Sequence, residues 1–140
     1  MTYNPSKKRN IHAMQVTRMI PMLAFADVEK ALGFYRDVLG FQVTDSYIED
    51  GRMTWCSVRA GSTQAMFQRH PEQARKNGGP VFWIYVDDVD DIHGTLKASG
   101  WRVGDPGTAH GRREFETVDT ESNPLMFCQL LDRPETARAQ

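Results

Sequence analysis

The sequence predicts an α+β fold of two similar βαβββ modules related by a pseudo-two-fold repeat. One observation is that Leu23–Val43 and Ile84–Val103 share the order strand, Asp, helix-spaced apolar residues, Gly and strand, once a single residue is dropped. Another is that Gly51–Gln68 aligns without a gap on Gly111–Cys128, with Gly-Arg, Val, Ser and Met-Phe recurring. Because one module is too small to close a core alone, we expect both to form a curved eight-stranded mixed sheet with a concave cleft.

The repeat also sets the predicted boundaries along the chain. In order, they are an N-terminal arm at 1–18, a single domain at 19–130 and a polar C-terminal tail at 131–140. Within the domain, module one spans 19–68, a linker spans 69–80 and module two spans 81–130. The linker is polar and ends in Asn-Gly-Gly-Pro, which is typical of a turn.

Module one begins with an alternating strand and a capped helix. Met19–Phe25 alternates between two faces, and Asp27 follows at the position of a helix N-cap. Gly40 is placed to end the helix in a left-handed conformation. The apolar stripe between cap and stop comprises Val28, Ala31, Leu32, Tyr35 and Leu39. The remaining strands are predicted at Phe41–Tyr47, Met53–Val58 and Gln64–Gln68.

Module two repeats this plan with one notable exchange. Val81–Val86 is the strand, Asp88 the cap, Ile92–Ala98 the helix and Gly100 the stop. At the helix position that Leu32 occupies in module one, module two has His93. The remaining strands are predicted at Trp101–Val103, Glu114–Val118 and Leu125–Leu130.

The composition excludes several classes of protein. The chain has 140 residues, a formal net charge of −1 and a pI near 6.4, which favours neither nucleic acid nor an anionic membrane as a partner. No apolar run approaches about 18 residues, and no signal-like segment follows Met1, so we expect a cytoplasmic protein. Cys56 and Cys128 are too few for a disulfide framework, and buried reduced thiols are expected.

Two motifs resemble a known superfamily. FYRDVLGF at Phe34–Phe41, together with VDDVDD at Val86–Asp91, is similar to the vicinal oxygen chelate superfamily of glyoxalase I, extradiol dioxygenases and bleomycin-resistance proteins. The resemblance covers Met19–Leu130. Gly111–Pro124 further resembles the bleomycin-resistance and metal-free branches, in which an Asp-Pro-x-Gly-Asn turn is common. Here Thr120 replaces the Pro and Ser122 the Gly, so bleomycin itself is not the expected ligand.

The resemblance implies four metal-ligand positions, on the first and fourth strands of each module. In this chain they are occupied by Ile20, Met66, Val81 and Met126. Alkyl groups donate no electrons to a metal, and a thioether is a poor ligand for hard divalent ions. We therefore expect no metal there and no cofactor.

The four histidines provide no alternative metal motif. His12, His70, His93 and His110 do not pair at helical spacing, and no HxH or HExxH sequence occurs. We expect His93 to be a packed or surface residue of its helix. His70 and His110 flank loops near strand ends, where either could reach the mouth of the cleft.

Strand alternation predicts which side chains face the cleft. Met22, Ala24, Trp83 and Tyr85 share a face with Ile20 and Val81, and Gln64, Gln68, Pro124 and Cys128 share one with Met66 and Met126. Aromatic walls and methionine sulfur suit a planar or aromatic molecule, although these residues could equally fill a core or a dimer interface. The predicted ligand-binding set is Met22, Met66, Gln68, Trp83, Tyr85, Arg113, Glu114 and Met126.

The charges at the start of one predicted inner strand suggest chemistry. Arg113 could bind a ligand carboxylate in bidentate fashion, and a partly buried Glu114, with Glu116 on the same face, could act as an acid or base. A structural ion pair is an equal alternative, and the sequence leaves open which face points inward. Trp55 and Phe115 match in the repeat, so both are expected to point away from the cleft if Glu114 points into it.

Three functions follow from these expectations. The first is a metal-independent protein that sequesters a hydrophobic or aromatic compound between its modules. The second is a lyase, isomerase or dioxygenase that uses Glu114 or a relocated metal site. The third is a non-catalytic dimer with a filled cleft. The resemblance also implies a homodimer, because short modules of such relatives often pair or swap.

Overall fold

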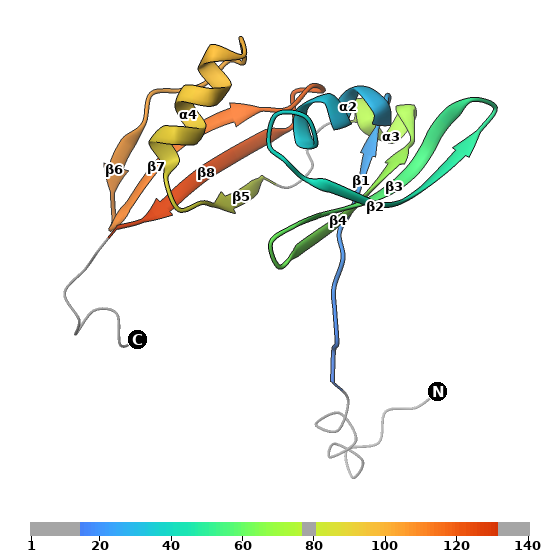
Figure 1. Ribbon diagram of the computed structural model, residues 1–140, viewed down its shortest axis with the longest axis horizontal. Coiled ribbons are helices and arrows are strands. Elements are labelled where there is room, and N and C mark those ends of the chain that lie inside the picture. Colours follow the sequence, from blue (N-terminus) through green and yellow to red (C-terminus); the bar gives the residue numbers. More distant parts are fainter. Residues whose placement is uncertain (1–14, 77–80, 132–140) are drawn as a thin grey trace.

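The computed structural model of the protein describes residues 15–76 and 81–131. It has the predicted α+β class, with two βαβββ modules side by side (Figure 1). Most of the predicted arm and tail, together with residues 77–80 of the predicted linker, lie outside the described residues. Hydrogen bonding divides the eight strands into two sheets of four, one sheet for each module.

The sheet of module one has the order β1-β4-β3-β2. Its strands are β1 at Met22–Phe25, β2 at Gln42–Glu49, β3 at Arg52–Ala60 and β4 at Thr63–Arg69. β1 is parallel to β4, and the other neighbours are antiparallel. Helix α2, at Val28–Tyr35, packs against β3 and β4.

The sheet of module two has the matching order β5-β8-β7-β6. Its strands are β5 at Phe82–Tyr85, β6 at Gly107–Ala109, β7 at Arg112–Val118 and β8 at Pro124–Leu130. β5 is parallel to β8, and helix α4, at Val89–Ala98, packs against β7 and β8. Both helices lie on the same side of the molecule, which leaves the opposite face of each sheet without a helix (Figure 1).

The predicted N-caps are confirmed in both modules, whereas the helix of module one ends at Tyr35, before the predicted stop at Gly40. The side chain of Asp27 accepts from the backbone N–H of Lys30 at 3.0 Å, and that of Asp88 accepts from Asp91 at 3.2 Å. Each carboxylate satisfies a donor that the first helical turn leaves free. Gly40 and Gly100 follow the helices at φ +83° and +86°, a left-handed conformation that side chains disfavour.

Each core lies between a helix and the sheet face that it covers. In module one Phe25, Leu32 and Phe67 are at most 1 % exposed, and in module two Leu96 and Phe127 are equally buried. Burial of such side chains contributes about 1.5–3 kcal/mol each, relative to leaving them exposed. The cores meet where Phe34 at the end of α2 makes an edge-on contact with Trp101, with 4.6 Å between ring centroids.

A second connection between the modules is polar. The backbone N–H groups of Ala26 and Asp27 in module one donate to the carboxylate of Glu121 at 2.7 and 3.0 Å. Glu121 belongs to the turn between β7 and β8 of module two. The turn therefore holds the start of α2 through charge-assisted hydrogen bonds.

One element prediction was wrong, and the predicted linker contains a helix that the sequence analysis did not expect. The helix in the linker is α3, at Pro71–Arg75. Proline suits its first position, because the backbone N–H that proline lacks would have no partner within the helix there. The predicted strand at Trp101–Val103 is reduced to an isolated bridge between Val103 and Thr117. The edge strand forms further along the chain, as β6, directly after Pro106, which has no backbone N–H to donate to a neighbouring strand.

The repeat also slips by one residue within the third strands. Phe115 pairs with Phe127, whereas the partner of Phe67 in module one is Cys56. Trp55 therefore does not match Phe115, as the ungapped repeat implied, but pairs with Gln68 on the helix-free face. The cause is the turn that follows, because residues 119–123 connect the pair Val118–Pro124, whereas residues 60–63 connect the equivalent pair Arg59–Gln64.

Candidate functional site

The helix-free face of module two carries a row of three side chains across three strands. Trp83 on β5 pairs with Met126 on β8, and Met126 pairs with Glu116 on β7. These residues share a face because side chains alternate along each strand while Leu125, Phe127 and Phe115 face the core. Trp83 is 45 % exposed, so the face is open to solvent.

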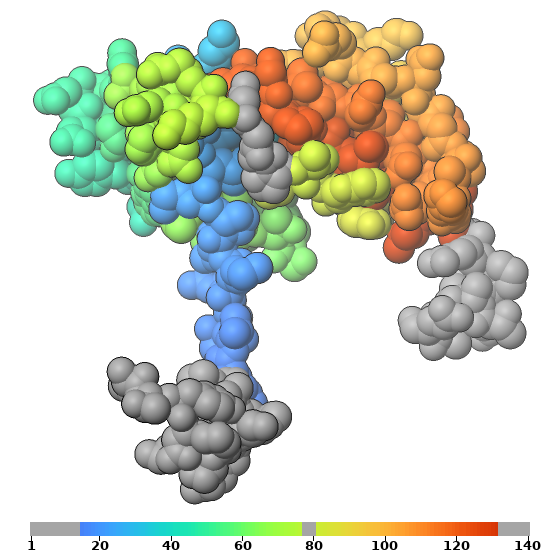
Figure 2. Space-filling model, turned by 180° about the vertical axis from the view of Figure 1, so that it is seen from behind, coloured from blue at the N-terminus to red at the C-terminus, as the bar shows by residue number. Residues whose placement is uncertain are grey.

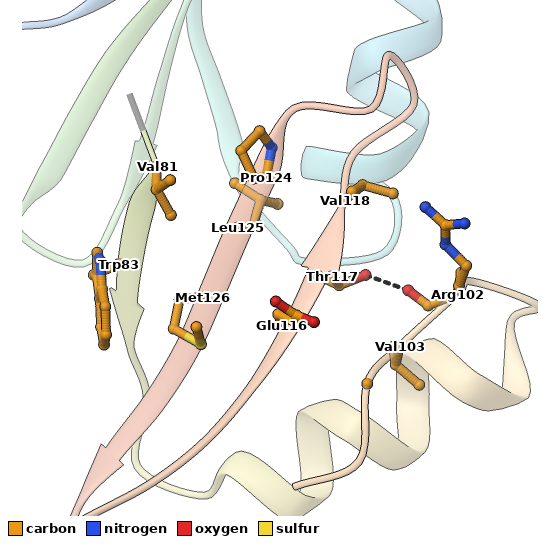
Figure 3. Close-up of a pocket in the computed structure, with 11 residues that line it drawn as sticks. Val81, Trp83, Arg102, Val103, Glu116, Thr117, Val118, Pro124, Leu125 and Met126 are labelled. Carbon is orange, nitrogen blue, oxygen red and sulfur yellow. Dashed lines mark hydrogen bonds between the residues drawn. The ribbon is translucent and has the colours of Figure 1, made fainter. Parts of the chain in front are cut away.

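This face is hollowed into a pocket of about 670 Å³, a size typical of small-molecule sites (Figure 3). We call it the module-two pocket. It is lined by Val81, Trp83, Arg102, Val103, Gly104, Glu116, Thr117, Val118, Pro124, Leu125 and Met126. The lining is mainly apolar, with an indole and a thioether among its larger groups.

The polar groups of the pocket come from β7 and from the segment that follows α4. The hydroxyl of Thr117 donates to the backbone oxygen of Arg102 at 2.6 Å, which fixes that segment against β7. Glu116 projects into the middle of the pocket beside Met126 (Figure 3). Arg102 lies at the edge, and its guanidinium points away from Glu116 (Figure 3).

A second row on the same face holds Tyr85, Cys128 and Glu114, which pair across β5, β8 and β7. The Glu114 carboxylate accepts from Arg112 Nε at 3.1 Å, and the Arg112 guanidinium lies over the Trp83 ring, 5.4 Å from its centroid. Burial raises the pKa of the Cys128 thiol, so it is protonated at neutral pH and a poor nucleophile. Glu114 therefore lies next to the pocket but within an ion pair.

The structure separates Arg113 from Glu114. Arg113 lies on the helix side of β7, where Nε and Nη2 donate to the Asp90 carboxylate of α4 at 2.8 and 3.0 Å. These bonds lower the pKa of Asp90 below its ordinary range. The arginine on the open face is Arg112, because neighbouring residues of a strand point to opposite faces.

Module one contributes a second open face, built from β1, β4 and β3. Met22 pairs with Met66, and Met66 pairs with Ser57, while Gln68 pairs with Trp55. The face is polar at its far end, where Gln64 donates to Ser57 Oγ at 3.0 Å and accepts from Arg18 at 3.1 Å. Of the predicted ligand-binding residues, Trp83 and Met126 line the module-two pocket, whereas Met22, Met66 and Gln68 lie on the face of module one.

The positions that the resemblance assigns to metal ligands carry no oxygen, nitrogen or thiolate donor. Met66 and Met126 are half-buried on the open faces, and Val81 is exposed at the pocket. Within residues 15–76 and 81–131, no group of three or more His, Cys, Asp or Glu side chains is arranged to hold a metal ion.

The histidines have other roles where the structure describes them. His70 caps α3, its Nδ1 accepting from the Gln73 backbone at 3.1 Å, and His110 lies in the turn before β7 at φ +52°. His93 Nε2 lies 3.0 Å from the backbone oxygen of Gly104, and its ring contacts Phe115 edge-on. His93, which module two has at the position of Leu32 in module one, thus connects α4 to the segment around Gly104 that lines the pocket.

Sequence reasoning missed the part of the pocket formed by Arg102, Val103 and Gly104, because it assigned residues 101–103 to a regular strand and gave Gly104 no role. A signal was present, since Gly104 and Pro106 interrupt the predicted strand region. Gly104 N–H donates to the backbone oxygen of Glu116 at 2.8 Å, so the interrupted segment still lies against β7.

The duplicated βαβββ arrangement, with helices on one side and an open pocket on the other, defines a two-module α+β protein. The chain belongs to the Glyoxalase/Bleomycin resistance protein/Dioxygenase superfamily, whose family model matches residues 13–126. The resemblance seen in the sequence is therefore confirmed. No curated protein sequence matches the chain significantly.

Similar solved structures show the same fold at low sequence identity. TioX from Micromonospora sp. ML1 is 21 % identical with a TM-score of 0.65, covering 84 % of this chain and 99 % of its own. TnmS3, an antibiotic binding protein from Streptomyces sp. CB03234, is 18 % identical with a TM-score of 0.64 and the same coverage. The bleomycin-binding protein of Streptomyces verticillus, complexed with copper(II)-bleomycin, is 24 % identical with a TM-score of 0.62, covering 86 % and 99 %.

None of the helices in the described ranges is both long and apolar enough to cross a membrane.

Proposed function

We propose that the protein binds a small hydrophobic or aromatic compound in the module-two pocket without a metal ion, and sequesters it rather than transforming it. The observation that carries this proposal is the apolar pocket of about 670 Å³, with Trp83 and Met126 side by side in it. An indole and a thioether together offer a flat, polarisable surface to an aromatic ring. Two of the structural neighbours named above are described as antibiotic- or bleomycin-binding proteins, which supports the same class of function.

The arrangement of charges favours binding over catalysis. Glu114, the acid–base candidate, is paired with Arg112, and Arg113 is engaged by Asp90 on the other face. A general acid or base must lie within hydrogen-bond reach of a reacting group and be free to exchange a proton. An enzyme that used Glu114 as its acid or base would require this carboxylate to leave Arg112 when a substrate binds.

A homodimer in the cytoplasm is part of the same proposal. Met22 and Tyr85 are 46 % and 58 % exposed on the open faces of one chain. Val16 and Met19, at 86 % and 90 %, lie on a segment that projects from the body (Figure 2). A second copy that covers these groups would remove apolar surface from water. The two buried free thiols fit a reducing compartment.

Titration calorimetry with a panel of planar aromatic compounds tests the binding proposal. The unaltered chain should bind members of the panel, and Trp83→Ala should weaken them about tenfold, since loss of aromatic stacking and burial is worth roughly 1–2 kcal/mol. Tyr47→Ala, an exposed aromatic on the β2 hairpin outside the pocket, is the matched control. Equal affinities for the unaltered chain and Trp83→Ala would contradict the proposed site.

Metal independence has its own test. The protein is dialysed against EDTA, its metal content is measured, and the titration is repeated. Affinity and melting temperature should stay unchanged, because the positions that hold the ion in metal-using relatives provide no oxygen, nitrogen or thiolate donor. Retention of a metal near one per chain, or affinity restored by an added divalent ion, would contradict the proposal.

A further inference from the structure

The module-two pocket contains a carboxylate that the rest of the structure leaves uncompensated. Glu116 is exposed to the pocket and stands in one row with Met126 and Trp83 (Figure 3). Throughout the described residues, no hydrogen bond or ion pair engages its side chain within the usual distances. A carboxylate can accept several hydrogen bonds, so this group retains its full capacity toward a ligand.

The neighbouring charged side chains are paired or point elsewhere, so the lack of a partner is particular to Glu116. Glu114, two residues earlier on the same face, is neutralised by Arg112 at 3.1 Å. Arg112 is thereby committed to Glu114 and to the ring of Trp83. Arg102, the other cation at the pocket, directs its guanidinium away from Glu116 (Figure 3). The middle of the pocket is therefore negative, while its walls are apolar.

The backbone around Glu116 is also fixed. The backbone oxygen of Glu116 accepts from Gly104 N–H at 2.8 Å, and the backbone oxygen of Gly104 is in turn bonded to His93 of α4. Gly104 has no side chain, and a Cβ there would lie 3.2 Å from Cγ of Glu116. The glycine thus leaves the space that the Glu116 side chain occupies, on a strand whose backbone is held in place by hydrogen bonds.

From these observations we propose that the ligand is an aromatic compound carrying a cationic group, such as a protonated amine, and that Glu116 binds this cation. The ring lies against Trp83 and Met126, and the cation donates charge-assisted hydrogen bonds to the carboxylate. This inference rests on the proposed function and adds the ligand's charge and the residue that selects it. A neutral aromatic compound could offer Glu116 only an uncharged donor, and an anionic one would be repelled by it, so both should bind more weakly than the cation.

Three naphthalene probes of one shape and different charge test the inference: 2-naphthylmethylamine, 2-naphthalenemethanol and 2-naphthoate. They are titrated calorimetrically at pH 7 into the full chain and into Glu116→Gln. The amine should bind the unaltered chain about fivefold to tenfold more tightly than the alcohol, and the carboxylate least, as expected for a partly exposed charge pair. In Glu116→Gln the advantage of the amine should disappear, while the affinity for the alcohol stays within about twofold.

The control variant is Glu72→Gln, which removes the same charge from α3 in the linker. It should retain the preference for the amine, since Glu72 lies outside the pocket. Equal binding of all three probes would overturn the inference and leave the proposed function standing. A preference for the amine that survives Glu116→Gln would overturn the role of Glu116. If none of the probes binds, the proposed function and the inference both fall.

Discussion

The phenol of Tyr35 donates a hydrogen bond to Oδ2 of Asp119 at 2.7 Å and so joins the last turn of α2 to the β7–β8 turn of the other module. Both residues are buried, at 4 % and 3 % exposure. Asp119 also accepts from the backbone N–H groups of Glu121 and Asn123 and from the Asn123 amide, so its buried carboxylate is fully paired. Burial and the charge of Asp119 raise the pKa of Tyr35 far above its ordinary value, which keeps the phenol protonated as a donor.

Replacement of Tyr35 by Phe tests this connection. The ring packing against Phe25 and Phe67 is retained, but the Asp119 carboxylate loses one of its donors. We expect the free energy of unfolding to fall by about 1–3 kcal/mol, the range for a buried hydrogen bond to a charged group. Urea denaturation measures it, with Tyr47→Phe as the control on an exposed hydroxyl. A fall of equal size in both variants would show that the buried bond contributes nothing.

The β7–β8 turn offers a stabilising substitution at Ser122. Ser122 adopts φ +65°, although a side chain in this region is disfavoured. Ser122→Gly should raise the free energy of unfolding by about 0.5–1 kcal/mol, because the strain at the positive φ is relieved. Ser46→Gly, in the extended strand β2, should instead lower it by a similar amount. Urea denaturation that ranks the two variants the other way would refute the role of backbone strain.

The dependence of stability on alkaline pH is the third prediction, and it concerns Cys56. Burial raises the pKa of its thiol to about 11 in the folded protein, whereas an unfolded cysteine ionises near 8.5. The contribution of Cys56 is complete below the unfolded pKa. It declines as the pH rises toward about 11, because the unfolded state releases its proton first.

We therefore expect the free energy of unfolding, measured in urea at constant ionic strength, to fall between about pH 8.5 and pH 11. Cys128 and Tyr35, whose pKa values are also raised, contribute to the same fall. The variant Cys56→Ala should start from a lower stability, because it leaves a small cavity, but should show a shallower decline. Parallel pH profiles for the two proteins would contradict a raised pKa at Cys56.

The repeat and the helix signals were sufficient to predict the fold. The helix signals depend only on local sequence, because each interacts with residues a few positions away in the chain. They are the caps Asp27 and Asp88 and the glycines Gly40 and Gly100. Strand register cannot be predicted from local sequence alone, because it depends on the length of the turn that joins two strands. The β7–β8 turn has one residue more than the β3–β4 turn, so Phe115 lies on the core face although the repeat matched it with Trp55, which lies on the open face.

Alternation along a strand was enough to predict which residues share a face with Trp83 and with Met126. Both side chains lie at the pocket, on the face opposite their core-facing neighbours Ile84 and Phe127. The face of β7 could not be settled from a run that begins Arg112-Arg113-Glu114, since either arginine could be counted as the inward residue. The contribution of Arg102 and Gly104 required tertiary contact with Glu116, which no local pattern contains.

The last prediction concerns Gly104, whose missing side chain makes room for Glu116. A Cβ at residue 104 would lie 3.2 Å from Cγ and 3.4 Å from the backbone oxygen of Glu116, so the strand or the carboxylate must shift by a few tenths of an ångström. Gly104→Ala should lower the free energy of unfolding by about 1 kcal/mol through overpacking. It should also reduce the preference for 2-naphthylmethylamine over 2-naphthalenemethanol, because Glu116 is displaced.

Gly107→Ala is the matched control for that variant. Gly107 lies on the neighbouring edge strand β6, and a Cβ there would meet no atom within 4 Å. This variant should be as stable as the unaltered chain or slightly more stable, since alanine restricts the unfolded state, and it should keep the preference for the amine. Urea denaturation and the paired titrations separate the two alanines, and indistinguishable behaviour would mean that the closeness of Gly104 to Glu116 does not position the carboxylate.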